Sequence, residues 1–452
     1  MSLWCELAFV GLCLISSALV SLVLVPERAQ RIVGLRRRRR LIAQNIRSDS
    51  LVREKLSTMR TLAGLSFLTF LPSTWVVVAA DRPVTPTKSS TASSRFPQYD
   101  HVLVLESTAE TSANVSIGDI NGDGHRDIVI AKGRHWPMIS RVLVGDGRGH
   151  FSSGYNLSDG AFRSYSARLV DIDGDDDLDV VLSNDAPDPK LVLLNDGKGH
   201  FHAGSRYGRP EWATRNVTVV DLNSDGLIDI VVANRGNQSS NYICLNKGKG
   251  QFDTTCTAFS TESATTIAAA DFNHDGLIDL AVPHRDGGQS FVYLASPKAT
   301  FSNLRRLPFG PPDATIRMAE AADFDGDGVL DIVAIDERQG VTISLGRKDG
   351  TFSPGMAIGN DKAAPYALAV RDLNDDGRAD IVVGNVEAPS TVLFNDGSGR
   401  HYTPIRFGDN RGTVYGFAIA DLDGDGLLDI AVARSDASNV VYFAKPPSAN
   451  IP

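Results

Sequence analysis

Short runs of β-branched and aliphatic residues recur along the chain from about residue 96, and glycine, aspartate or asparagine bounds each run. In one stretch these runs cover residues 167–170, 180–182 and 191–194, and a fourth begins after Phe201. Short apolar runs separated by turn residues are typical of β-strands joined by tight turns. The pattern therefore predicts an all-β fold built from units of four strands.

The same unit returns about every 50 residues, a period typical of propeller blades and solenoid repeats. The last unit stops after its third strand, residues 440–443, whereas an extra strand, residues 96–105, precedes the first unit. We expect this extra strand to complete the last unit and close a ring, because a linear array would leave both ends unpaired. The predicted fold is a seven-bladed β-propeller of four-stranded blades over residues 96–446.

Each unit contains the motif D-x-[DN]-x-D-G-x-x-D between its first and second strands. The seven copies begin at Asp119, Asp171, Asp221, Asp271, Asp323, Asp372 and Asp421. Clustered carboxylates repel one another unless a cation lies among them. Oxygen donors at positions 1, 3, 5 and 9, with a backbone carbonyl at position 7, suit a hard divalent cation.

The predicted metal ligands are the residues at these five positions of each copy. They are Asp119, Asn121, Asp123, His125, Asp127, Asp171, Asp173, Asp175, Asp177, Asp179, Asp221, Asn223, Asp225, Leu227, Asp229, Asp271, Asn273, Asp275, Leu277, Asp279, Asp323, Asp325, Asp327, Val329, Asp331, Asp372, Asn374, Asp376, Arg378, Asp380, Asp421, Asp423, Asp425, Leu427 and Asp429. Ordinary Asp-Gly hairpin turns are the alternative. An EF-hand is excluded, because position 12 is apolar instead of glutamate.

The N-terminal part has a different pattern. Residues 1–25 form an apolar segment, residues 26–60 a basic stretch with five consecutive arginines, and residues 61–80 a second apolar segment. Residues 81–95 are a linker rich in proline, serine and threonine. The basic stretch predicts a cytoplasmic loop between two membrane spans. Alternatively, residues 59–80 are a signal peptide that starts at Met59. Both alternatives place the repeats outside the cytoplasm, secreted, periplasmic or at the cell surface, and a tail of residues 447–452 follows them.

Charge and cysteine content add two points. Residues 1–60 contain 11 Lys or Arg against 4 acidic residues, a net +7, so the total of −9 leaves about −16 for the rest. This acidity belongs mostly to the repeated loops and gives no support to nucleic-acid binding. Cys244 and Cys256 flank a predicted hairpin. The two alternatives for this pair are a cross-strand disulfide and two free thiols.

The face opposite the acidic loops gathers the loops between blades and those between second and third strands. Its distinctive side chains include Arg134, His135, Asn234, His284, Arg317 and Arg434. The predicted ligand-binding residues are Trp136, Arg163, Tyr165, Trp212, Arg215, Arg235, Arg285, Tyr366 and Tyr415. Aromatic and arginine residues are enriched in binding surfaces. The alternative is that these side chains fill the central channel or pack between blades.

The seven acidic loops and the Gly-x-Phe hairpins, such as the one ending at Phe201, resemble the FG-GAP/VCBS repeats of integrin α-chain heads and of secreted bacterial proteins. The resemblance covers residues 96–445 and implies calcium, up to seven ions, in a structural role. The second loop departs from the pattern, because Asp176 replaces the glycine at position 6. Aspartate tolerates the left-handed conformation, so we expect a weakened site there.

The resulting functional expectation is a non-catalytic recognition or adhesion module for a protein or glycan ligand, with the membrane as a second partner if the N-terminal segment is not cleaved. The sequence has no nucleophile elbow, zinc-protease motif, phosphate loop or dinucleotide fingerprint. The alternatives are a carbohydrate-active enzyme, a polysaccharide lyase or hydrolase, and a purely structural surface module.

Overall fold

The computed structural model describes residues 96–236, 239–296, 301–359 and 362–446. Their regular secondary structure consists of β-strands alone, as expected. The predicted apolar, basic and linker segments of residues 1–95 and the tail lie outside the described residues. The described part of the chain contains no helix that is long and apolar enough to cross a bilayer.

Five antiparallel sheets contain four strands each, in chain order. The first holds β2 (Ser112–Gly118), β3 (Asp127–Lys132), β4 (Arg141–Leu143) and β5 (Tyr155–Asn156). The second holds β6 (Ser164–Val170), β7 (Asp179–Asn184), β8 (Lys190–Asn195) and β9 (Phe201–Tyr207). The third holds β10 (Thr214–Val220), β11 (Asp229–Asn234), β12 (Asn241–Cys244) and β13 (Thr257–Ser260).

The fourth sheet holds β14 (Ala268–Ala270), β15 (Asp279–Val282), β16 (Ser290–Leu294) and β17 (Arg305–Phe309). The fifth holds β18 (Ile316–Ala322), β19 (Asp331–Asp336), β20 (Gly340–Ser344) and β21 (Met356–Ala357). Eight further strands form one sheet, in which a single pair, Val386 and Thr413, joins two four-stranded halves. One half holds β22 (Ala364–Arg371), β23 (Asp380–Val386), β24 (Ser390–Asn395) and β25 (Tyr402–Phe407). The other holds β26 (Thr413–Ala420), β27 (Asp429–Ser435), β28 (Val440–Lys445) and β1 (Gln98–Val104).

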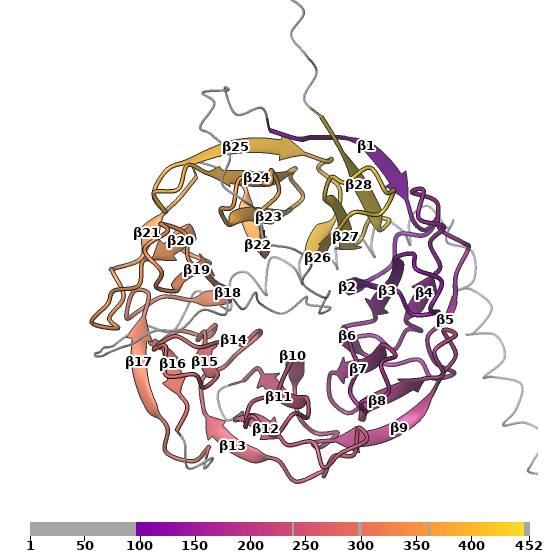
Figure 1. The fold of residues 1–452 in the computed structure, drawn as a ribbon, viewed down its shortest axis with the longest axis horizontal. Coiled ribbons are helices and arrows are strands. Elements are labelled where there is room, and N and C mark those ends of the chain that lie inside the picture. The colour runs from indigo at the N-terminus through magenta and orange to yellow at the C-terminus, as the bar shows by residue number, and fades with distance from the viewer. Residues whose placement is uncertain (1–95, 237–238, 297–300, 360–361, 447–452) are drawn as a thin grey trace, which may run out of the picture. The chain divides into compact units, whose positions relative to one another are not determined.

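The first strands of successive units lie side by side around a common centre. β2 contacts β6, β6 contacts β10, and the series continues through β14, β18, β22 and β26 back to β2. In Figure 1 these seven strands are the ones nearest the centre, and the later strands of each unit lie progressively farther out. This β-propeller-like arrangement places the loops between first and second strands at equivalent positions of every unit.

The N-terminal strand β1 completes the last unit, as the sequence predicts. It pairs antiparallel with β28, with Val102 opposite Tyr442 and Val104 opposite Val440. Tyr99 anchors it, because this side chain is 4% exposed and its ring lies 5.5 Å from that of Phe407 in β25. The two ends of the repeat region therefore share one sheet, which removes two open edges.

Second strands are buried on both faces. Every residue of β3, β7, β11, β15 and β19 is buried. Side chains alternate between the two faces of a strand, and neighbouring sheets cover each face here. This explains why the second strands read as continuous apolar runs, for example residues 128–131, instead of alternating with polar residues.

The start of the fourth strand needs a correction. A fourth strand directly at the Gly-x-Phe ending is right for β9 and, with Tyr402 in the equivalent place, for β25, but Phe151 and Phe352 make only isolated bridges, to Gly145 and Gly346. In the third unit β13 begins only at Thr257, well after Phe252. The aromatic side chains are 9% exposed or partly buried and pack in the apolar layer between units. Packing between units sets the position of these aromatic residues, and the outer strand begins at a different distance after them from one unit to the next.

The sulfur atoms of Cys244 and Cys256 are bonded, which settles the alternative between a disulfide and free thiols in the structure. We predict that Cys256→Ser lowers the free energy of unfolding by about 2–3 kcal/mol, because the bond closes a short loop in the unfolded chain. Urea unfolding of both proteins under non-reducing conditions measures the difference. Equal stabilities, or two thiols that react with a labelling reagent in the folded wild-type protein, would contradict the assignment.

Candidate functional site

The acidic loops are shaped by hydrogen bonds from their own backbone. In the first loop Asp119 accepts from the N–H groups of Gly122 and Gly124, at 2.9 and 2.8 Å, and Asp123 accepts from the N–H of His125 at 2.9 Å. Gly124, at position 6, has a φ of 84°, which costs glycine little. Asp176 takes the same place in the second loop with a φ of 72°, so it adopts the left-handed conformation, and the expected weakening of that site remains a prediction.

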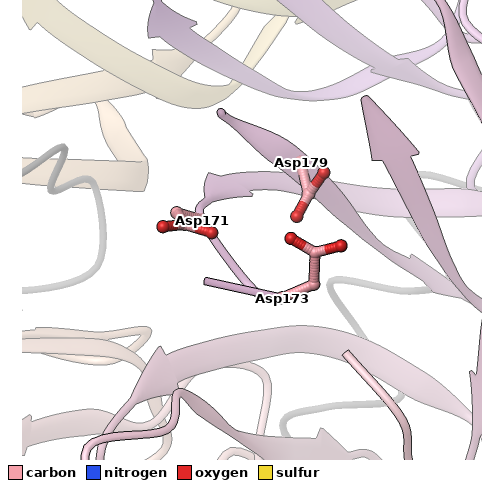
Figure 2. A group of neighbouring side chains, drawn as sticks. All are labelled: Asp171, Asp173 and Asp179. Atoms are coloured by element: carbon pink, nitrogen blue, oxygen red, sulfur yellow. The ribbon is translucent and has the colours of Figure 1, made fainter. Parts of the chain in front are cut away.

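Carboxylates converge in three of these loops. The groups Asp171, Asp173 and Asp179; Asp323, Asp325 and Asp331; and Asp421, Asp423 and Asp425 each offer oxygen atoms within 4.8 Å of one another. Figure 2 shows the first group, with the carboxylates of Asp173 and Asp179 pointing toward each other and that of Asp171 beside them. Oxygen atoms at these separations fit the ligand set of a hard cation such as Ca²⁺.

The other four loops have asparagine at position 3. Its amide nitrogen donates to the position 5 carboxylate, for example from Asn121 to Asp123 at 3.0 Å and from Asn273 to Asp275 at 3.0 Å. An asparagine oxygen is also a ligand that Ca²⁺ accepts. A cation in these loops would therefore meet fewer charges but a similar number of oxygen donors.

The aspartate at position 9 has a structural role that the sequence interpretation did not include. Asp331 is fully buried, and its two oxygen atoms accept from the N–H groups of Phe324 at 2.8 Å and Gly346 at 2.7 Å. One donor lies in the acidic loop and the other follows the third strand, so the carboxylate joins three segments of one unit. The same two kinds of bond are made by Asp127, Asp179, Asp229, Asp279, Asp380 and Asp429.

Burial makes the charge on these carboxylates costly. It raises the pKa of Asp127 to about 6, that of Asp331 to about 7 and that of Asp279 to about 8, although the backbone N–H donors lower each value. The negative charges of the neighbouring aspartates in each loop raise the pKa of the position 9 carboxylate further. A carboxylate has about four lone-pair sites, so two N–H bonds leave room for a cation. The position 9 residues as metal ligands remain a prediction.

Asparagines at or just after the ends of third strands fix three of the acidic loops to the next unit, a feature that sequence reasoning missed. The side-chain amide of Asn195 donates to the carbonyl of Ile120 at 2.7 Å, that of Asn246 to Ile172 at 2.9 Å, and that of Asn395 to Phe324 at 2.8 Å. Each acceptor is the second residue of an acidic loop in the preceding unit. The recurring asparagine before the hairpin turn was the available sequence signal.

At the inner edge, β-bulges occur in six of the first strands. The extra residue is Ala113 in β2, Tyr165 in β6, Arg215 in β10, Arg317 in β18, Tyr366 in β22 and Tyr415 in β26. A bulge redirects the side chain of the residue that has no partner. Five large polar or aromatic side chains therefore come from equivalent positions next to the centre of the ring.

These side chains contact one another in the order of the units. We call Arg134, Tyr165, Arg215, Arg317, Tyr366 and Tyr415 the arginine–tyrosine ring. The guanidinium of Arg134, from the β3–β4 loop, lies 3.7 Å from the ring centre of Tyr415 and 5.9 Å from that of Tyr165. Arg215 lies 4.6 Å from Tyr165, and Arg317 lies 3.6 Å from Tyr366. The hydroxyl groups of Tyr366 and Tyr415 are 2.9 Å apart.

Acidic residues pair with most of the arginines. Arg215 pairs with Asp185 at 2.5 Å, and Arg317 and Arg285 both pair with Glu337, the latter at 2.8 Å. Arg235 pairs with Asp286 at 2.9 Å. His135 connects two of these groups, because its ring lies 3.3 Å from Asp185 and 2.9 Å from the hydroxyl of Tyr165.

The predicted ligand residues thus divide into two sets. Tyr165, Arg215, Tyr366 and Tyr415 belong to the ring, Arg285 and Arg235 lie beside it, and Arg134 and Arg317 join it although they were not in the predicted set. Trp212 instead stacks on Tyr242 with ring centres 3.9 Å apart, and Arg163 pairs with Asp188 at 2.9 Å. For these two residues the structure favours the packing alternative. Trp136 is 62% exposed, the most exposed large apolar residue in the described part.

The ring alters the acidity of Tyr366. Burial alone would raise the pKa of this hydroxyl, but the guanidinium groups of Arg317, Arg134 and Arg285 outweigh burial and lower the pKa to about 7. A tyrosine with a lowered pKa adds stability that is fully present above pH 10 and is lost as the pH falls through about 7.

We predict that wild-type protein shows a tyrosinate absorbance change with a midpoint near pH 7 and that Tyr366→Phe abolishes it, as ultraviolet difference spectra measure. Tyr207→Phe is the matched control, because burial raises the pKa of Tyr207 and no cation opposes this. A titration near pH 7 that survives in Tyr366→Phe would contradict the assignment.

Comparison with known proteins supports the repeat assignment. A family model described as an FG-GAP-like repeat matches residues 119–182, 171–232, 221–282, 323–383 and 372–432, which together make up more than half of the chain. No curated protein sequence matches this chain significantly. The matched segments begin at acidic loops and end within the second strand of the following unit.

Among solved structures, BBS1N in complex with ARL6DN aligns with a TM-score of 0.52 and 12% identity, over 79% of this chain and 99% of that one. An Agrocybe aegerita lectin that recognises non-reducing terminal N-acetylglucosamine aligns with a TM-score of 0.49 and 20% identity, over 72% and 86%. The V. cholerae biofilm matrix protein Bap1 aligns with a TM-score of 0.42 and 10% identity, over 79% and 92%. Identities this low bear on fold alone. By its repeats, the chain belongs to the FG-GAP-like repeat family.

Proposed function

We propose that this protein is a calcium-binding, seven-bladed β-propeller that works outside the cytoplasm as a non-catalytic recognition module for a protein or glycan. Recognition is the role that the inner edge supports best. The observation that carries the proposal is the arginine–tyrosine ring, in which bulges bring aromatic and guanidinium groups from separate units to one place. Such groups dominate binding surfaces.

Calcium is proposed for the acidic loops. Three loops hold converging carboxylates, and each loop has a fully buried aspartate whose charge is costly without a counter-ion. When bound, the ion would supply positive charge that holds positions 1, 3 and 5 together. We assign the ions a structural role, because each loop joins the first and second strands of its unit.

The proposed location outside the cytoplasm rests on the pattern of the N-terminal sequence and on one disulfide bond. Two apolar segments with a basic stretch between them precede the repeats. The disulfide between Cys244 and Cys256 is of the kind that persists in oxidising compartments. N-terminal sequencing of the mature protein tests the proposal: a start near Asp81 indicates a cleaved signal, and an intact N-terminus with membrane association indicates an anchor.

A ligand screen tests recognition. The purified protein is applied to a glycan array and to extracellular proteins in calcium, and hits are repeated with Tyr415→Ala. Tyr415 contributes its ring to Arg134 and its hydroxyl to Tyr366, so we expect loss of binding to the hits. Arg206→Gln, on the exposed outer strand β9, is the control. Absence of any hit, or hits that Tyr415→Ala leaves unchanged, would count against the ring as the recognition site.

A second candidate function is carbohydrate cleavage, which one specific contact favours. Asp185, His135 and Tyr165 form a hydrogen-bonded series beside two arginines, an arrangement in which the tyrosine hydroxyl can transfer a proton. Incubating bound polysaccharides with the protein separates the two functions. Shortened products that disappear in Tyr165→Phe would favour the enzyme, whereas intact ligand would favour the recognition module.

A further inference from the structure

One cluster of arginines at the inner edge of the ring of sheets carries more positive charge than its ion-pair partners carry negative charge. Five arginines, Arg134, Arg215, Arg235, Arg285 and Arg317, face three acidic partners, Asp185, Asp286 and Glu337. Glu337 is shared between two arginines. The cluster therefore holds two guanidinium charges that its own carboxylates do not balance.

Of these five arginines, Arg134 is the one with no ion pair to an acidic residue within the described part of the chain. Its polar contacts are the hydroxyl of Ser435 at 3.4 Å and the hydroxyl of Tyr165, and its guanidinium otherwise lies against the rings of Tyr415 and Tyr165. The Nε atoms of Arg134 and Arg317 are both buried, and neither has a hydrogen-bond partner within the described residues. Buried donors without a partner are costly, so these two atoms indicate that an acceptor is missing.

The field at this place favours an anion. The cations beside Tyr366 lower the pKa of its hydroxyl to about 7 despite burial, so a negative oxygen is stabilised there. A bound carboxylate would experience the same field. Guanidinium groups are also the strongest partners for carboxylates, because two N–H groups can donate in parallel.

The loop that supplies Arg134 also provides an apolar surface for the rest of a ligand. Trp136 is 62% exposed and His135 has 45% of its side chain exposed, both within two residues of Arg134. An exposed indole offers a flat apolar face with a polar edge. A pyranose ring with a carboxylate fits this pair of features, since its C–H face can stack while its carboxylate reaches the guanidinium.

We propose that the arginine–tyrosine ring binds the carboxylate of an acidic sugar, with Arg134 pairing with the carboxylate and Trp136 stacking on the sugar ring. This inference rests on the proposed recognition function and specifies its ligand class.

The experiment compares glucuronate-terminated oligosaccharides with glucose-terminated oligosaccharides of the same length by calorimetry, in calcium and low salt. We expect wild-type protein to prefer the acidic sugar by about tenfold or more, and Arg134→Gln to lose that preference while Arg134→Lys retains part of it. Arg206→Gln is the matched charge control and keeps the preference. Trp136→Ala is expected to weaken both sugars several-fold.

A spectroscopic readout on the full-length protein checks the location independently of affinity. A carboxylate bound beside Tyr366 disfavours its ionisation, so the acidic oligosaccharide is expected to move the tyrosinate titration to higher pH, while the neutral one leaves it in place. Arg134→Gln itself should also raise the midpoint in the absence of sugar. Melting curves in calcium confirm that each variant is folded.

The outcomes distinguish this inference from the proposed function. Equal binding of both sugars, or an acid preference that survives Arg134→Gln, overturns the inference but leaves a recognition module. Arg134-dependent binding of an acidic peptide in place of the sugar also overturns it. Absence of binding to either sugar, with hits elsewhere on the array, overturns the inference alone, and absence of any hit overturns both.

Discussion

Removal of calcium is expected to lower the melting temperature of the protein by about 15 °C. Each independent site that is filled at one hundred times its Kd adds about 2.7 kcal/mol to the free energy of unfolding. Three sites, the number of loops with converging carboxylates, would add about 8 kcal/mol. For a domain of a few hundred residues each kcal/mol corresponds to about 2 °C. Calorimetry with excess calcium and with excess chelator measures the difference.

Reversibility and ion selectivity are the controls. Adding calcium back after chelation should restore the transition, whereas the same concentration of magnesium should restore less, because Mg²⁺ requires a more regular octahedral set of oxygen ligands. An unchanged melting temperature in chelator would contradict structural calcium in these loops. Equal recovery with magnesium would keep a divalent site but would contradict the assignment of calcium.

The repeated part of the fold was accessible from the sequence because it depends on local chemistry. A turn at position 6 requires a residue that tolerates positive φ, and a short apolar run after it requires cover on both faces. Both requirements act within about ten residues, so they recur visibly in every copy. The closure by β1 could also be predicted. The last unit has only three strands of its own and one extra strand precedes the first unit, so the extra strand can complete the last unit.

The centre of the ring was less accessible, since it depends on register. Tyr165, Arg215, Arg317, Tyr366 and Tyr415 look unrelated in the sequence, and only the bulge at each strand start gives them equivalent positions. A bulge shifts pairing by one residue, which periodicity cannot reveal. Arg134 was passed over for the predicted ligand set because its importance comes from the tyrosines of two neighbouring units.

The aspartate at position 9 of the acidic motif is repeated for two reasons that the sequence alone could not separate. Position 9 is aspartate in every copy, which on sequence grounds indicates a metal ligand. The structure shows that the same carboxylate accepts two backbone N–H groups at the junction of three segments. A buried hydrogen-bond acceptor and a metal ligand both require aspartate, so substitution in the presence and absence of the ion is needed to separate them.

We therefore expect the two kinds of aspartate in one loop to respond differently to substitution. Asp331→Ala should lower the free energy of unfolding by about 3–5 kcal/mol in chelator as well as in calcium, because the N–H groups of Phe324 and Gly346 lose the carboxylate that accepts them in a buried place. Asp325→Ala, at position 3, should cost about 2–3 kcal/mol in calcium and less than about 1 kcal/mol in chelator. Its single backbone bond, from the N–H of Asp327, is long at 3.3 Å.

Urea unfolding of the wild-type protein and both variants, with calcium and with chelator, measures these six stabilities. The difference between the two conditions reports how much calcium each variant still binds. If Asp331 is both a ligand and an acceptor, its variant loses stability in chelator and also gains less from calcium than the wild-type protein. An Asp331→Ala variant that is as stable as the wild-type protein in chelator would contradict the hydrogen-bonding role. An Asp325→Ala variant that gains as much from calcium as the wild-type protein would contradict the metal site in this loop.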